Sequence, residues 1–247
     1  MSTLFSEIQR LLERTYASVG LNLEECLIDR RRCSQLSALA GAQAAELSML
    51  ARTFLRAVDG RLRVGIYYSS WLIEQLEKHD PRSGLSDANI KALIAFVEEI
   101  NHALHAALQF RRGESPKRDE EYARNLELQA QVDTYLVLLL FVAFFRRPGK
   151  ITRADRKWLR FHMFESRHYR SFRDKTISAR YEETTLLAKS YTSYLESLAA
   201  SRRIEEIRIF HALEYDRKRE RIFSLRERNA AAIRNRESKG RDLGGNL

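Results

Sequence analysis

The feature that most constrains the fold is the absence of glycine and proline from a long part of the chain. Neither residue occurs between Gly149 and Gly240, a run of ninety residues. Turns in β-proteins depend on these residues at short intervals, so such a run favours helices. The chain of 247 residues is 44% hydrophobic, which is enough apolar material for a core. The sequence therefore predicts an all-α fold, a multi-helix bundle of about seven to nine helices with a long charged C-terminal helix.

Helix-start signals and the spacing of apolar residues place the expected helices. Ser86 and the pair Thr152 and Asp155 have the positions of N-terminal caps. Residues 62–68 have β character. Two interpretations of this segment are open: a short strand, or a loop or broken helix. The predicted helices are 3–18, 22–41 with a cap at Asn22, 42–58, 86–112, 116–145, 152–164, and 177–199 and 202–236 as two helices or one rod.

The most hydrophobic stretch of the chain is 135–145, with the sequence YLVLLLFVAFF. Eleven residues are too few to cross a bilayer, which needs about 20, so we predict a buried core helix and no transmembrane segment. Acidic residues near the start of the chain replace the apolar run of a signal peptide, so we expect no export. Cys26 and Cys33 are the only cysteines, which fits a reducing compartment and a cytoplasmic protein.

Charge is distributed unevenly along the chain. Residues 1–110 hold 12 Lys+Arg and 13 Asp+Glu, whereas residues 111–247 hold 31 and 20. We therefore predict a helical bundle domain over 1–200, near-neutral in 1–110 and basic in 111–200, and a basic charged helix and tail over 201–247.

The basic residues are densest between Arg146 and Lys175, where aromatic residues lie among them. Arginine and lysine neutralise phosphates or carboxylates, so this region is expected to bind an acidic protein or a nucleic acid. Attachment to anionic lipid is a third, less favoured interpretation, and solvated helix faces are the plainest one. The expected contact residues are Arg153, Arg156, Lys157, Arg160, Arg167 and Arg170.

Two E-x-x-H pairs are the strongest chemical signal. Glu99 with His102 and Glu165 with His168 each place both side chains on one helix face. Two such pairs, with carboxylates from other helices, build the di-iron or di-manganese sites of four-helix bundles. Asp133 is the candidate for a further ligand or a second-shell base, because it lies in the middle of an apolar stripe.

The surroundings of the two pairs differ. Alanines share the face of Glu99 and His102, which would let a second helix pack closely and partly bury both side chains. A buried Asp133 needs a partner, which could be an arginine, a histidine or a metal, whereas Glu127 is expected on the other side of its helix. Three arginines crowd the second pair and would oppose a metal cation: Arg160, Arg167 and Arg170.

The leading interpretation is a non-enzymatic helical binding or adaptor protein whose basic C-terminal half engages an acidic partner, without a cofactor. The alternative is a ferritin-like iron or manganese protein with oxidase or oxygenase activity. Its ligands would be Glu99, His102, Asp133, Glu165 and His168. Structural pairing of these residues and metal-free acid/base catalysis are the other open interpretations.

Overall fold

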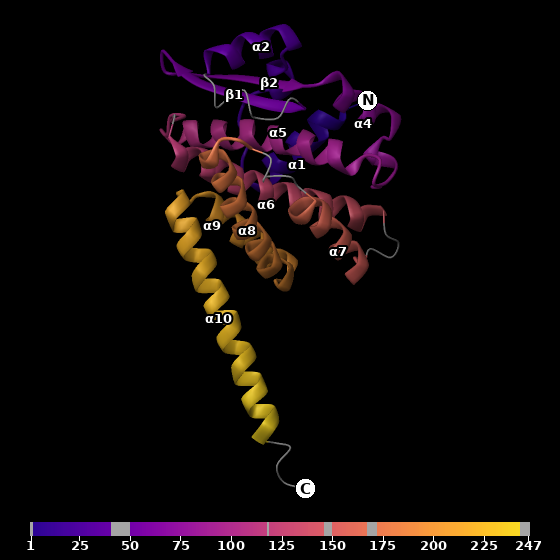
Figure 1. Cartoon of the computed structure of the whole chain (residues 1–247), viewed down its shortest axis with the longest axis vertical. Coiled ribbons are helices and arrows are strands. Elements are labelled where there is room, and N and C mark those ends of the chain that lie inside the picture. The colour runs from indigo at the N-terminus through magenta and orange to yellow at the C-terminus, as the bar shows by residue number, and fades with distance from the viewer. Residues whose placement is uncertain (1, 41–49, 118, 146–149, 167–171, 243–247) are drawn as a thin grey trace. The chain divides into compact units, whose positions relative to one another are not determined.

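A computed structural model of the chain describes residues 2–40, 50–117, 119–145, 150–166 and 172–242, with side chains described as far as Arg228. The chain divides into two units, residues 1–189 and 190–247 (Figure 1). The α-helices of unit 1 are α1 (Leu4–Thr15), α2 (Arg30–Leu39), α4 (Ser70–Lys78), α5 (Ile90–Arg111), α6 (Glu120–Phe145), α7 (Arg153–Arg160) and most of α8 (Lys175–Ser197). Unit 2 contains the end of α8, α9 (Ala200–His211) and α10 (Tyr215–Asp242). The prediction that the chain is mainly helical is confirmed.

Helices α5 and α6 form the centre of unit 1. Small residues on α5 are fully or almost fully buried, among them Ala92, Ala103 and Ala106, and they let the neighbouring elements approach this helix closely. A two-stranded sheet lies on the other side of α5, while α7 packs against α6 (Figure 1). Because α6 is enclosed on several sides, most of its middle is buried, polar residues included.

Strands β1 (Ala51–Val58) and β2 (Arg61–Tyr68) form an antiparallel hairpin. The helix predicted over 42–58 is wrong for residues 51–58, and residues 41–49 lie outside the described residues. The cause is the turn: Asp59 and Gly60 both have positive φ, 50° and 68°, which gives the tight two-residue connection that matches strand twist. Of the two interpretations of residues 62–68, the strand is correct. The predicted all-α class is wrong in this respect, because the mainly helical chain also contains the hairpin.

Three other boundaries differ from the predictions. Asn22 caps only the short 3₁₀ helix Leu23–Cys26, and Asp29 begins α2 separately, because Leu27 forms a bridge to the edge of β2 at Ile66. Helix α5 begins at Ile90 rather than directly after Ser86. The region 177–236 is not one rod, since breaks after Ser197 and His211 separate α8, α9 and α10.

Within the described residues, α6 is the one helix that has the length and composition of a membrane span. Of its most apolar stretch, 67% is buried inside the protein, which is the behaviour of a core helix. The finding is consistent with the prediction that no segment crosses a membrane.

One polar cluster joins the three helices of unit 2. Glu206 on α9 accepts two hydrogen bonds from the guanidinium of Arg221 on α10, at 2.7 and 2.6 Å, and a third from the Tyr191 hydroxyl on α8, at 3.0 Å. Burial disfavours the carboxylate, but the hydrogen bonds to Arg221 and Tyr191 outweigh burial and hold the pKa of Glu206 below its usual value. The cluster therefore stabilises unit 2 while Glu206 is ionised.

We expect Glu206→Gln to lower the free energy of unfolding by about 1–2 kcal/mol at neutral pH, because Arg221 loses its partner and is itself partly exposed. Because the folded pKa is depressed, this stabilisation is present above the unfolded pKa of about 4.5 and is lost as the pH falls through the folded value. Urea unfolding measures both effects. Glu220→Gln is the matched control, since the Arg217–Glu220 pair is exposed and should change stability by less than about 0.5 kcal/mol. An equal loss in both variants would contradict the assignment.

Candidate functional site

The candidate site is a row of buried polar side chains between α5 and α6, which we call the polar seam. At one end His102 lies between two carboxylates: its Nδ1 is 3.5 Å from Glu99 Oε2 and its Nε2 is 3.4 Å from Glu127 Oε2. The three side chains are 18%, 14% and 7% exposed. The expectation that close packing on the alanine face partly buries Glu99 and His102 is confirmed.

The charge state of His102 follows from this position. Burial disfavours the imidazolium, but the hydrogen bonds and charges of Glu127 and Glu99 outweigh burial and raise the pKa of His102 well above its usual 6.5. The seam therefore holds a cation between two anions at neutral pH. A metal bound by this imidazole would have to displace the proton from one of its ring nitrogens.

A second group lies further along the seam. Asp133 Oδ2 is 2.6 Å from His105 Nε2, and Asp133 Oδ1 accepts a hydrogen bond of 2.5 Å from the hydroxyl of Tyr16. Gln129 donates to both Asp133 and Tyr16, at 3.2 and 3.1 Å. His105 and Asp133 are almost fully buried, so Asp133 has the histidine partner that was one of its predicted alternatives.

The seam also reaches α8. Gln131 donates to Glu127 at 2.8 Å and to the Thr184 hydroxyl at 3.2 Å, and it accepts from Thr185 at 3.1 Å. Each of these buried groups thus has a hydrogen-bonding partner from a different helix, as burial requires. Chemically, the arrangement holds charges and protons at fixed positions inside the protein, away from solvent.

Of the other predicted metal ligands, Glu165 does not join this cluster. Glu165 is half exposed and pairs with Lys189 Nζ at 2.8 Å, while His168 lies outside the described residues. Among the residues that the structure places, there is no group of three or more His, Cys, Asp or Glu side chains arranged to hold a metal ion. The dinuclear site stays a prediction.

Sequence reasoning missed three members of the seam: His105, Tyr16 and Glu127. Glu127 was expected on the far side of its helix, but α6 is buried on more than one face. The signal that was present is the row of polar residues at every second position of an otherwise apolar helix, Glu127, Gln129, Gln131 and Asp133. Polar residues in such a helix require partners on every neighbour.

The predicted anion-binding residues fall into three groups. Arg153 and Lys157 lie one turn apart on α7 and are exposed. Arg156 is half-buried, and Arg160 turns inward, donating to the Lys189 carbonyl at 2.6 Å and lying over the rings of Tyr135 and Phe164. Arg167 and Arg170 lie outside the described residues.

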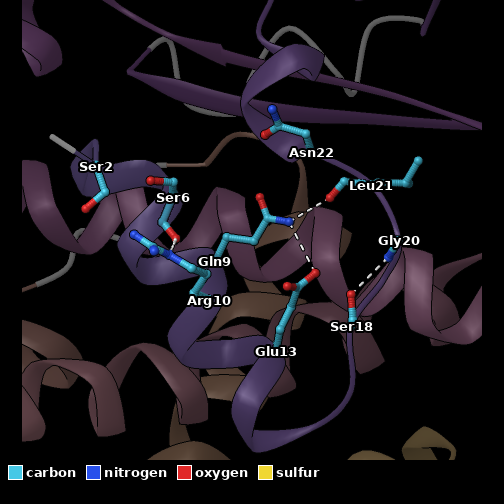
Figure 2. A pocket seen from close by; sticks show the side chains of 9 residues that line it. All are labelled: Ser2, Ser6, Gln9, Arg10, Glu13, Ser18, Gly20, Leu21 and Asn22. Atoms are coloured by element: carbon cyan, nitrogen blue, oxygen red, sulfur yellow. Dashed lines mark hydrogen bonds between the residues drawn. The ribbon is translucent and has the colours of Figure 1, made fainter.

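An open depression of about 500 Å³ lies beside α1, and polar side chains line it (Figure 2). Its central side chain, Gln9, donates to the Leu21 carbonyl at 2.7 Å and to Glu13 at 3.2 Å, and accepts from the Leu23 amide at 3.1 Å. Glu13 also accepts from the Val19 amide. These groups hold the loop after α1 in place, and their hydrogen bonds account for the polar lining.

No protein-family model matches the chain, and no curated protein and no solved structure is similar to it.

We expect His102→Gln to lower the free energy of unfolding by about 2 kcal/mol near pH 6, because two buried carboxylates lose their cation. A raised folded pKa means that this stabilisation is complete below the unfolded value of 6.5 and is lost as the pH rises through the folded pKa. The difference in the free energy of unfolding between the variant and the unmodified chain should therefore shrink at alkaline pH. Urea unfolding from pH 6 to alkaline pH measures this difference. His79→Gln is the control. A deficit that grows with pH would contradict the assignment.

The metal alternative has its own test, elemental analysis of protein purified without chelator. A dinuclear centre would give iron or manganese at about one or two atoms per chain, lost in Glu99→Ala and His102→Ala but kept in His79→Ala. Metal that is absent, or that all three variants keep, would rule out a centre at the seam.

Proposed function

We propose that the chain is a non-enzymatic, cytoplasmic binding protein whose basic C-terminal half engages an acidic partner, a protein or a nucleic acid. The single observation that supports this proposal is the surface of α7. Arg153 and Lys157 are exposed there, one turn apart, and Lys150 is exposed directly before the helix. Neither Arg153 nor Lys157 makes an ion pair with a described carboxylate.

The opposite side of α7 is fixed to unit 1. Asp155 and Leu159 are buried, and Thr152 and Asp155 form a complete capping box, which confirms the predicted helix start. Arg153 and Lys157 are therefore presented on a rigid helix, whereas Lys150 precedes it. Pre-organised cations lose little conformational entropy when an anion binds.

The basic residues of unit 2 contribute less to this proposal. Arg203 donates to the Leu195 and Leu198 carbonyls, Arg221 is held by Glu206, and Lys218 is buried over the ring of Phe210. These cations hold the unit together. They explain why net charge alone overstates the free basic surface of this half of the chain.

The test removes three charges from the start of α7. We expect K150Q/R153Q/K157Q to weaken binding to poly-L-glutamate or to a DNA duplex by about tenfold at low salt, since each exposed contact contributes up to about 1 kcal/mol. Binding of the unmodified chain should weaken steeply with salt and persist in EDTA. Fluorescence anisotropy measures both.

The matched control is K78Q/K91Q/K117Q, which removes the same charge from three other exposed positions of unit 1. If the two triple variants lose affinity equally, binding reports net charge only and the α7 surface is not a site. Binding that EDTA abolishes would also contradict the proposal.

A further inference from the structure

A cluster of arginines lies on the β-hairpin, in the part of the chain whose net charge is near zero. Residues 27–69 contain seven arginines and no lysine, against three acidic residues. Three of these arginines, Arg56, Arg61 and Arg63, lie at the turn end of the hairpin and are exposed. We call these three the arginine tip.

The pairing of the strands places the arginine tip on one face of the sheet. Arg56 on β1 is directly opposite Arg63 on β2, and Arg61 precedes Arg63 by two residues on β2. Directly paired side chains point to the same face about 5 Å apart, and alternate residues of a strand are separated by about 7 Å. The other face turns toward α5, where Thr53 donates to the Glu99 carbonyl.

Within the described residues, the arginine tip has no partner in the protein. None of the three guanidinium groups forms a hydrogen bond or ion pair with any residue that the structure describes, and the nearest acid along the chain is Asp59 in the turn. Like charges directly opposite one another destabilise a hairpin. Solvated faces ordinarily mix charges of both signs, so an unbalanced array of this kind is suited to an external anion.

The surroundings favour a polyphosphate over the other anionic surfaces. No large hydrophobic side chain of the hairpin is exposed, so a membrane or an apolar protein interface would find no anchor there. Arginine binds phosphate oxygens through two parallel hydrogen bonds, which lysine cannot do.

The arrangement also favours a duplex over a single strand. Single strands bind by stacking bases on exposed aromatic rings. The aromatic residues on this face, Phe54 and Tyr67, are only half exposed, and Arg52 lies over the Phe54 ring at 4.8 Å while donating to Ser37 of α2. Helix α2 thus covers that end of the hairpin, and at the other end the exposed side chains on this face are those of the arginine tip.

We propose that the arginine tip binds the phosphate backbone of a nucleic-acid duplex, without sequence preference. This surface is separate from α7 and goes beyond the proposed function. Three phosphate contacts imply a definite salt dependence: each contributes about −0.9 to the slope of log Kobs against log salt concentration.

The experiment is anisotropy of a fluorescent DNA duplex of about 20 base pairs, titrated with the full chain at several salt concentrations. R56Q/R61Q/R63Q should reduce the slope by about 2.7, so that the unmodified chain loses about 40-fold more affinity than the variant between 50 and 200 mM salt. R56K/R61K/R63K keeps the charge and should keep the slope. An unchanged slope in the glutamine variant, or no duplex binding by the unmodified chain at low salt, overturns the proposal.

Two further variants separate this proposal from its alternatives. K150Q/R153Q/K157Q removes the same charge from α7: if it lowers the slope while R56Q/R61Q/R63Q does not, the hairpin proposal fails and the α7 proposal stands. Asp59→Asn removes the acid from the turn with a residue that tolerates positive φ, and should tighten duplex binding about twofold without any loss of folding. No tightening in that variant counts against the proposal.

The choice of duplex is tested by exchanging the probe. Poly-L-glutamate, and vesicles containing phosphatidylserine, should bind with little dependence on the arginine tip. If either loses affinity in R56Q/R61Q/R63Q as strongly as the duplex does, the partner class is wrong. The glutamine variant should melt no lower than the unmodified chain, because a repulsive pair has been removed.

Discussion

The close contact of α5 and α6 is the constraint on which the rest of unit 1 depends. The polar residues between the two helices are buried and must find partners inside the protein. His102 and His105 select particular carboxylates on α6, which fixes the register of one helix against the other. An apolar interface could slide by a turn at modest cost, whereas a paired seam cannot, because a shift would strand buried charges.

The same seam positions the surrounding elements. Tyr16, just beyond α1, reaches Asp133; Thr184 on α8 meets Gln131; and Thr53 of the hairpin donates to the Glu99 carbonyl. Each contact is a hydrogen bond to a group that is already held by another partner. The core of unit 1 is therefore specified by polar geometry as much as by apolar burial.

Local signals predicted the helices with one exposed and one buried face, such as α1 and α7, because their apolar period and caps lie within a few residues. Strand β1 was missed because Ala51–Val58 is rich in residues that also form helices, and its pairing with β2 is a non-local contact. The overlooked signal was Asp59-Gly60 directly before the alternating residues at the start of β2. In the seam, the burial of Asp133 could be predicted from its position in an apolar stripe. Its partner could not, because which residue of α5 faces Asp133 depends on how α5 and α6 pack together. Glu127 was expected on the far side of α6 because the prediction assumed a helix with one buried face. Helix α6 is instead enclosed on several sides.

The charge prediction failed for a different reason: the net charge summed over a long segment conceals a local excess of arginine. Residues 1–110 balance almost to zero, yet the seven arginines of the α2 and hairpin region lie within a short stretch of chain, and the acids that balance them lie mainly elsewhere. Charges interact over about 10 Å at ordinary salt concentrations, so a partner responds to the local array and not to the total. Because α5 and α6 lie between the hairpin and α7, the two basic surfaces of unit 1 are separated by the thickness of the core (Figure 1). A straight duplex cannot contact both at once, so the two proposed surfaces are independent of each other, and a test of one leaves the other unaffected.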